Sequence, residues 1–422
     1  MTAANASDLP GPLHGLRVLE LTDEKGQFCG KLMADLGADV IKIEPPGGQP
    51  TRRVGPFLDD TPHPERSLAF WHYNTSKRGI TLNLEHAQGQ ALFKRLVRSA
   101  DIVLESYAPG YLPGLGLGYE ALSSLNPRLI MCSLTPFGQA GPWRDYVTSD
   151  LLHLAAGGQM AGSGYDPEDV PDAPPIAPGG GNAWHMGGHY GYMAILAALY
   201  YRDGSGAGQY IDASIHEACA LTTESHVTTY TYTGQVVRRH TGRAASPDDS
   251  EKAQMATHDG RWITIIRPSF QLTPARLRRM AESMAAYGMA ADLLDEKYQD
   301  MRVIQANLNH IGDVLRQFVA QRPQDEAWQW GQKHGVPWGA VRSLDEIMGD
   351  EHLQDRGFFT EVEHPELGRR FVYPGPAAIY NESPWRISRR APLIGEHNVD
   401  ILGGELGLAK ADLVILAETG VI

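Results

Sequence analysis

The chain has 422 residues, of which 42% are hydrophobic and 21% charged, and its formal net charge is −13. This length is enough for two or more domains around a large core, and the composition excludes wholesale disorder. A net negative chain lacks the basic surface that non-specific nucleic-acid binding requires, so we expect no nucleic-acid partner.

The cysteine content and the apolar runs of the sequence indicate the cellular compartment of the protein. The three cysteines, Cys29, Cys132 and Cys219, form no CxxC pair, which argues against a disulfide scaffold or a cysteine-based zinc module. No basic segment followed by an apolar one opens the sequence, and the longest apolar run, near 191–201, is too short to span a bilayer. We therefore expect a cytoplasmic protein without membrane contact.

The first third of the chain alternates between strand-like and helix-like patterns. Short runs rich in β-branched residues predict four strands, at 17–21, 39–44, 101–105 and 129–134. Helical spacing predicts helices at 28–36 and 86–98 between them. Alternation of this kind implies parallel strands joined by crossovers, so we predict an open α/β unit over 11–137.

The rest of the chain changes character twice. A Gly- and Pro-rich segment at 138–182 predicts a surface loop system. It is followed by a predicted helix at 186–201, a strand at 209–215 and a helix from His216. Beyond a polar loop at 233–259, a strand and several helical segments reach about residue 334, so residues 225–330 are expected to form a smaller domain.

Two histidines in the sequence His185-Met-Gly-Gly-His189 have the spacing that lets a helix present both to zinc. The general-base Glu of the HExxH motif is missing, and no third ligand is suggested nearby. We expect no metal site here.

A set of segments occurs in order from about residue 11 to the C-terminus, at 11–21, 36–48, 74–82, 100–105, 109–110, 125–130, 137–142, 195–199, 206–209, 335–337 and 391–397. No single segment is specific, but the ordered set is. Together these segments resemble the class III CoA-transferases, the family of formyl-CoA transferase, carnitine CoA-transferase and α-methylacyl-CoA racemase.

This resemblance implies an α/β fold with an open, Rossmann-like large domain, a smaller middle domain and two chains interlocked as a dimer. On this sequence the large domain would take residues 1–224 and the small domain 225–330. The C-terminal segment, 331–422, would return to the large domain.

The resemblance also implies a reaction that moves CoA from an acyl-CoA to a free carboxylic acid, with CoA esters as substrates and no permanently bound cofactor. One Asp carboxylate attacks the thioester, giving an acyl anhydride and then an enzyme-bound thioester. The nucleophile has to be a carboxylate because the intermediate must be as activated as a thioester.

This sequence departs from the family at the nucleophile. The family Asp falls at Ala183 or Trp184, and no Asp or Glu occurs between Ala173 and Arg202. We therefore assign no catalytic residue, and His185 is a weak candidate because acyl-imidazole chemistry would be a new mechanism. The histidine that the racemases place before this Asp is matched by Ser149.

The CoA cleft shows a second departure, since the turn after the first predicted strand carries Asp23-Glu24 where the family has small and apolar residues. Two carboxylates beside a phosphate-bearing ligand are unfavourable unless they are offset. If this chain binds CoA, the matches to cleft residues are Asn74, Lys77, Arg78, Ser106, Tyr107 and Thr135.

We expect the chain to be the non-catalytic subunit of a heteromeric CoA-transferase, with a homologous Asp-bearing partner. Such a complex would move CoA from succinyl-CoA, or a similar donor, to a carboxylic acid such as benzylsuccinate. One alternative is a self-sufficient CoA-transferase or acyl-CoA isomerase that uses an unusual group near His185. Another is a regulatory protein that binds CoA esters.

Overall fold

A computed structural model describes residues 9–223, 225–248, 252–265 and 272–422. By contacts, the chain divides into two compact units. The first comprises 1–157, 178–222 and 351–422, and the second comprises 158–177 and 223–350. The division at 224/225 and 330/331 expected from the sequence stays a prediction.

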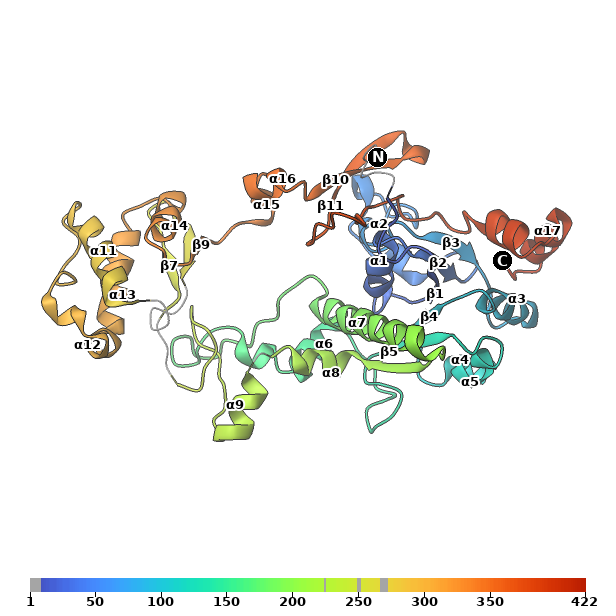
Figure 1. Cartoon of the computed structure of the whole chain (residues 1–422), viewed down its shortest axis with the longest axis horizontal. Coiled ribbons are helices and arrows are strands. Elements are labelled where there is room, and N and C mark those ends of the chain that lie inside the picture. The colour runs from blue at the N-terminus through green and yellow to red at the C-terminus, as the bar shows by residue number, and fades with distance from the viewer. Residues whose placement is uncertain (1–8, 224, 249–251, 266–271) are drawn as a thin grey trace. The chain divides into compact units, whose positions relative to one another are not determined.

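A six-stranded parallel sheet organises the first unit, with strand order β3-β2-β1-β4-β5-β6 (Figure 1). The order reverses between β1 and β4, which is where open α/β sheets form a ligand crevice at the carboxyl ends of their strands. The expected α/β fold is confirmed. The strands are β1 (Arg17–Leu21), β2 (Asp39–Glu44), β3 (Arg78–Thr81), β4 (Ile102–Glu105), β5 (Ile130–Thr135) and β6 (Tyr210–Ser214).

The strand β3 was not predicted, whereas the other five strands of the sheet match predicted runs. Its four residues, Arg-Gly-Ile-Thr, include a glycine and contain too few apolar side chains to form a strand-like run. The strand forms because it pairs with β2, from Ile41 opposite Arg78 to Glu44 opposite Thr81. Tertiary pairing thus overrides a weak local preference.

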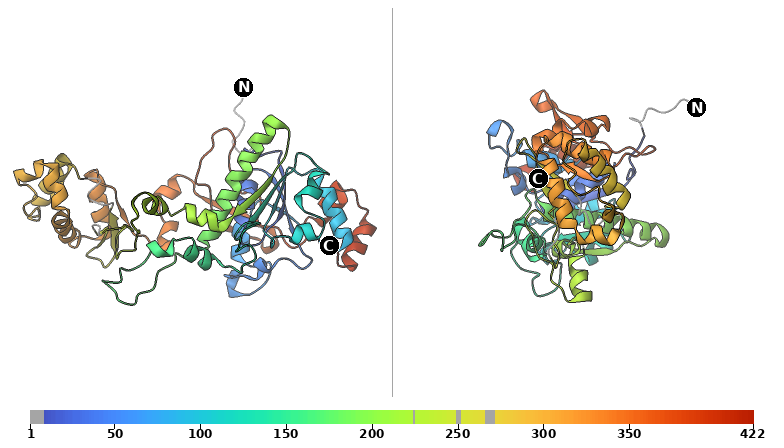
Figure 2. Two further views of the ribbon diagram at one scale, coloured as in Figure 1. Left: turned by 90° about the horizontal axis from the view of Figure 1, so that it is seen from below. Right: turned by 90° about the vertical axis from the view of Figure 1, so that its left-hand side faces the viewer.

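Helices cover both faces of the sheet because successive strand residues point to opposite sides. Val18 faces a core formed with α1 (Gln27–Asp35) and α7 (Asn182–Ser205). Leu19 faces a core formed with α3 (Ala87–Val97) and α17 (Lys410–Glu418). Figure 2 shows α7 along one face of the sheet and α3 beside α17 on the other.

The remaining elements of the first unit are short. The C-terminal segment adds an antiparallel pair of strands and a π-helical turn at Val399–Glu405 before α17. These elements are α2 (Leu68–Tyr73), α4 (Tyr111–Gly114), α5 (Tyr119–Ser123), α6 (Asp150–Ala156), α8 (Ile215–Leu221), α16 (Glu351–Asp355), β10 (Phe359–His364) and β11 (Arg369–Pro374).

The second unit has its own core, which contains Phe318, Trp330 and Trp338. A three-stranded antiparallel sheet in the order β7-β8-β9 packs with helices around it. The elements are α9 (His226–Thr233), β7 (Gln254–Ala256), β8 (Trp262–Ile265), α11 (Pro274–Ala285), α12 (Met301–Ala306), α13 (Leu308–Val319), α14 (Gln324–Lys333), β9 (Trp338–Ala340) and α15 (Leu344–Met348).

A buried ion cluster lies between α1 and the sheet. Glu20 of β1 is fully buried and pairs with Lys42 of β2 at 3.0 Å and with Lys77 at 2.7 Å. Burial alone would raise the pKa of Glu20, but the two lysine charges outweigh it and lower that pKa. Burial lowers the pKa of Lys77 to about 8, against the opposing effect of Glu20. The cluster thus holds its charges by mutual pairing.

A substitution at Gly30 of α1 tests how tightly this cluster packs. A Cβ atom at Gly30 would lie 1.9 Å from Glu20 Oε2 and 3.1 Å from Lys77 Nζ. Gly30→Ala improves helix propensity, yet we expect it to lower the free energy of unfolding by about 2 kcal/mol because the ion cluster must shift. Chemical denaturation measures this change.

The matched control is Gly114→Ala in α4, where a Cβ would meet no heavy atom within 4 Å. We expect that variant to be at least as stable as the parent chain. Equal stability of the two variants would contradict tight packing around Glu20.

Candidate active site

The first turn of α7 is where the family nucleophile would lie. The helix begins at Asn182, four residues before the predicted start, after Gly181 in a left-handed conformation with φ 71°. Ala183 and Trp184 therefore occupy the first turn, where backbone N–H groups and the helix dipole favour a negative charge. Ala183 is buried and Trp184 half-buried, and neither side chain can form an acyl anhydride.

A carboxylate from another helix reaches this turn. Asp150 opens α6, where the hydroxyl of Ser149 accepts a hydrogen bond from the N–H of Leu152. The backbone N–H of Ala183 donates to Asp150 Oδ1 at 2.8 Å, across 33 residues of sequence. The sequence excludes an acidic residue only between Ala173 and Arg202, and the fold brings one to this turn from α6.

His185 lies in the same turn and contacts two aromatic residues. Its Nε2 shares a hydrogen bond of 2.8 Å with Tyr73 Oη, and its ring centroid is 4.5 Å from that of Phe28. Burial lowers the pKa of His185, and the neighbouring His189 lowers it further, although Asp150 acts in the opposite direction. Burial and the charge of Asp150 raise the pKa of Tyr73. The imidazole is therefore neutral near neutral pH.

A second histidine packs against Trp184 from α6. His153 has no exposed surface, and its ring centroid lies 5.5 Å from that of Trp184. Its Nε2 shares a hydrogen bond of 2.7 Å with Thr148 Oγ1, while Nδ1 has no hydrogen-bond partner among the described residues. Burial, with a smaller effect from His216, lowers the pKa of His153 to about 4. The ring is therefore held neutral.

Two predicted CoA-binding residues, Asn74 and Lys77, belong to the buried cluster around Glu20. Lys77 donates to Asn74 Oδ1 and to the backbone oxygen of Gln27, each at 3.0 Å. Both side chains are fully buried and lie against the start of α1. Their observed partners are protein groups, and their contribution to CoA binding stays a prediction.

Three other predicted CoA-binding residues follow neighbouring strands. Ser106 and Tyr107 come directly after β4, and Thr135 ends β5. The Tyr107 ring is 4.6 Å from Tyr111, and Thr135 is buried with Oγ1 lacking a hydrogen-bond partner among the described residues. The carboxyl ends of these strands thus carry the polar side chains expected at a ligand crevice.

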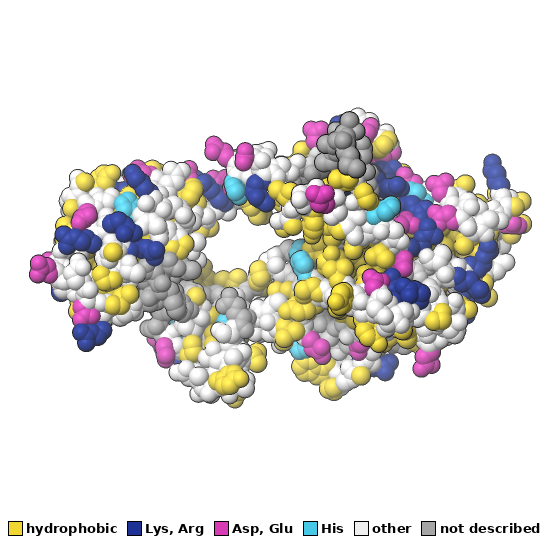
Figure 3. Space-filling model, in the orientation of Figure 1, with side chains coloured by type: hydrophobic (Ala, Val, Ile, Leu, Met, Phe, Trp, Pro, Cys, Tyr) yellow, Lys and Arg dark blue, Asp and Glu magenta, His cyan; other side chains and the backbone are white. Residues whose placement is uncertain are grey.

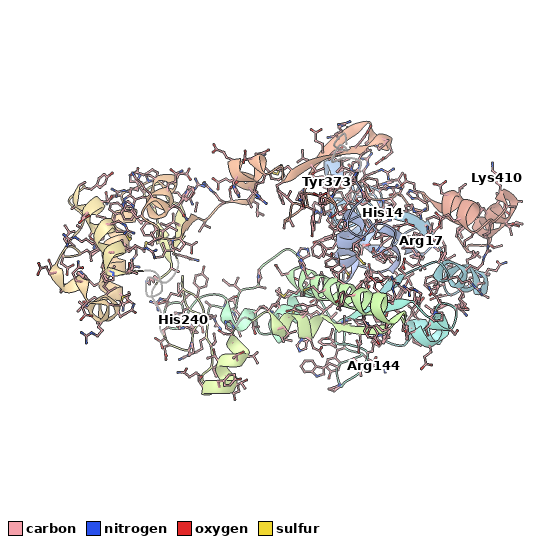
Figure 4. All side chains as sticks on the ribbon, viewed as in Figure 1. His14, Arg17, Arg144, His240, Tyr373 and Lys410 are labelled. Carbon is pink, nitrogen blue, oxygen red and sulfur yellow. The ribbon has the colours of Figure 1, made fainter. Side chains whose placement is uncertain are left out.

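Arg78 lies apart from the other predicted CoA-binding residues. It opens β3 at the amino end and pairs with Asp39 at 2.7 Å and with Glu405. Arg17 of β1, labelled in Figure 4, shares both partners. Arg78 therefore lies at the opposite end of the strands from Ser106 and Thr135, and its role in CoA binding stays a prediction.

The acidic turn after β1 is partly neutralised. Ser106 donates to Asp23 Oδ1 at 2.8 Å and accepts from the Asp23 backbone N–H at 3.0 Å. Lys25 forms an ion pair with the same carboxylate. The charge of Asp23 is thus offset from both sides, which reduces its conflict with a phosphate-bearing ligand.

Across the described ranges, no group of three or more His, Cys, Asp or Glu side chains is arranged to hold a metal ion. No helix in the described part of the chain is long and apolar enough to cross a membrane.

The family is established by comparison with known proteins. The model of CoA-transferase family III matches residues 13–398, so the chain belongs to this family. It is therefore a CoA-transferase family member whose substrates are CoA thioesters, and the expected family is confirmed.

Three curated relatives are similar over nearly the whole chain. The chain is 33% identical to succinyl-CoA:(R)-benzylsuccinate CoA-transferase subunit BbsE of Thauera aromatica, covering 92% of each protein. It is 30% identical to the succinyl-CoA–L-malate CoA-transferase beta subunit of Chloroflexus aurantiacus, covering 97% of this chain and 98% of that protein. It is 34% identical to the succinyl-CoA–D-citramalate CoA-transferase of the same organism, covering 98% of each.

A solved structure agrees with the fold. A CAIB/BAIF family protein from Brucella suis is 27% identical, with a TM-score of 0.78, over 94% of this chain and 99% of that one. The class III CoA-transferase fold expected from the sequence is confirmed.

The buried His153 makes stability depend on pH. The pKa of His153 is about 4 in the folded chain, below the ordinary value of 6.5, so the unfolded chain binds a proton more readily. The contribution of the neutral His153 to the free energy of unfolding is therefore complete above about pH 6.5 and is lost as the pH drops toward 4. When the pH is lowered from about 7 to about 5, we expect the free energy of unfolding of His153→Leu to fall by roughly 1 kcal/mol less than that of the parent chain.

Thermal or chemical denaturation at both pH values measures this difference. The control is His352→Leu in α16, whose side chain is exposed. A loss of stability at low pH that is the same in the parent chain and His153→Leu would show that His153 is not held neutral.

Proposed function

We propose that this chain is the subunit of a heteromeric CoA-transferase that lacks the family nucleophile. A homologous partner chain would carry the Asp at the family position and perform the transfer through it. In this sense the chain is the non-catalytic subunit, and it would complete and stabilise the assembly. The observation that carries the proposal is the first turn of α7, where Ala183 and Trp184 stand and the family reaction needs a carboxylate.

The names of two relatives support a subunit role. The Thauera and Chloroflexus proteins at 33% and 30% identity are each named as one subunit of a succinyl-CoA-dependent transferase. By analogy we propose succinyl-CoA, or a similar thioester, as the donor and a carboxylic acid such as benzylsuccinate as the acceptor. The citramalate transferase at 34% identity carries no subunit in its name.

The apolar surface of α7 is consistent with a partner. Met193, Tyr200 and Tyr201 of this helix are exposed, and hydrophobic side chains gather on this face of the first unit in Figure 3. Aromatic side chains of this kind are enriched at protein interfaces. We propose that the partner chain covers them in an interlocked dimer of the family type.

A self-sufficient transferase is the second candidate, and the environment of His185 favours it. The imidazole is neutral and shares a hydrogen bond with Tyr73, so one of its nitrogens has the lone pair that a nucleophile requires. In that case the chain would transfer CoA without an Asp-bearing partner.

Co-expression with an Asp-bearing homologue from the same host separates these candidates. We expect the two chains to purify together, and the complex to transfer CoA at least about 100-fold faster than this chain alone, because the family nucleophile is on the partner. Native mass spectrometry gives the composition, and transfer from succinyl-CoA to added acids gives the rate.

Replacing the partner's nucleophilic Asp by Asn should abolish most of that rate. The control in this chain is Asp203→Asn, at the exposed far end of α7, which should leave it unchanged. If this chain alone transfers CoA as fast as the complex, the heteromeric proposal is wrong.

A further inference from the structure

A carboxylate lies at the N-terminus of α7 although the helix has no acidic residue in its first turn. Asp150 Oδ1 accepts the N–H of Ala183, and the family position falls at Ala183 or Trp184. The carboxylate therefore contacts the backbone of the turn that contains the family position. It arrives from α6 instead of from α7.

The second oxygen of this carboxylate remains available. Among the described residues, no hydrogen bond or ion pair reaches Asp150 Oδ2, and the side chain is only partly buried. A carboxylate that served only to cap the helix would need one oxygen for this purpose. Asp150 holds one oxygen in place and leaves the other able to react.

His153 supplies an independent observation one helical turn later on α6. Its imidazole is completely buried against Trp184, yet Nδ1 has no hydrogen-bond partner in the described part of the chain. Buried polar atoms in native proteins are almost always satisfied, so an unpartnered one marks a place where a water, an ion or a ligand can bind. Residues three apart on a helix share one face, so Asp150 and His153 lie on the same side of α6.

We propose that Asp150 is an acyl-accepting nucleophile in this chain's own site. The inference rests on membership of the CoA-transferase family and goes beyond the heteromeric assignment. The partner's Asp would carry the main turnover, while Asp150 would form a second, slower site within the same assembly.

The chemistry balances without any further reactant. Asp150 Oδ2 attacks the thioester carbonyl carbon, the carbon–sulfur bond breaks, and CoA leaves as its thiolate, so that a mixed anhydride forms. The thiolate then attacks the Asp150 carbonyl carbon and expels the donor acid as a carboxylate that carries one oxygen from Asp150. The resulting Asp150–CoA thioester is attacked by the acceptor carboxylate, and the same two exchanges in reverse order give the new acyl-CoA and restore Asp150.

Mass spectrometry of the full chain after incubation with succinyl-CoA tests the proposal. Asp150 and His185 fall in one tryptic peptide, 145–202, because no Lys or Arg separates Arg144 from Arg202. Fragment ions of that peptide therefore have to locate the adduct. We expect an acyl or CoA adduct on Asp150 that hydroxylamine removes.

Asp150→Asn should lower the yield of adduct by at least about tenfold, because an amide is a far weaker nucleophile than a carboxylate. The amide oxygen of Asn can still accept the N–H of Ala183, so this variant keeps the helix cap. The matched control is Asp145→Asn, an exposed carboxylate in the same peptide that pairs with Arg144, and it should keep the adduct. Figure 4 labels Arg144.

The adduct measured on the parent chain decides whether the proposal holds, even if Asp150→Asn fails to fold. No adduct, or an adduct on His185, overturns the proposal. If the parent chain shows no adduct while the complex with the partner is active, this inference fails and the heteromeric function stands. If the adduct forms on Asp150 but no Asp-bearing partner associates, the inference stands and the heteromeric function fails.

Discussion

The pairing of Glu20 with two lysines fixes the elements around the candidate active site. Removing three charges from water is costly, and the cost is offset only when each charge has partners in good geometry. Lys42 comes from β2, Lys77 precedes β3, and Lys77 also reaches the backbone oxygen of Gln27 at the start of α1. The cluster therefore ties the first turn of α1 to the sheet, and with it Phe28, the ring that contacts His185.

The start of α7 shows that an electrostatic role can persist while the residue that fills it changes. The first turn of a long helix presents unpaired N–H groups and a partial positive charge, and a carboxylate is the natural group to satisfy both. In the family as the resemblance describes it, this carboxylate belongs to the helix. Here Gly181 and Trp184 cannot supply it, and Asp150 accepts the N–H of Ala183 instead.

Local pattern was sufficient to predict most of the sheet, whereas the position of the missing nucleophile follows from the family resemblance and stays a prediction. Buried parallel strands are short, mostly apolar runs, and β1, β2 and β5 have this character. The strand β3 has too few apolar residues to be recognised. Asp150 could be found only in three dimensions, because 33 residues and a Gly- and Pro-rich loop separate it from Ala183. Arg78 was matched to the CoA cleft by the family resemblance, and it pairs at the amino end of the sheet, so that its role in CoA binding stays a prediction.

The two sites of a heteromer built on this chain would differ in how rigidly they hold their carboxylates. A nucleophile on α7 is placed by one continuous helix, whereas Asp150 depends on the packing of α6 against α7 and on one hydrogen bond. Catalysis by a positioned group weakens quickly when its geometry loosens, since even an ångström of misplacement is costly. A displaced carboxylate is therefore expected to capture acyl groups slowly, which gives a physical reason for the chain to rely on a partner that keeps the carboxylate on the helix.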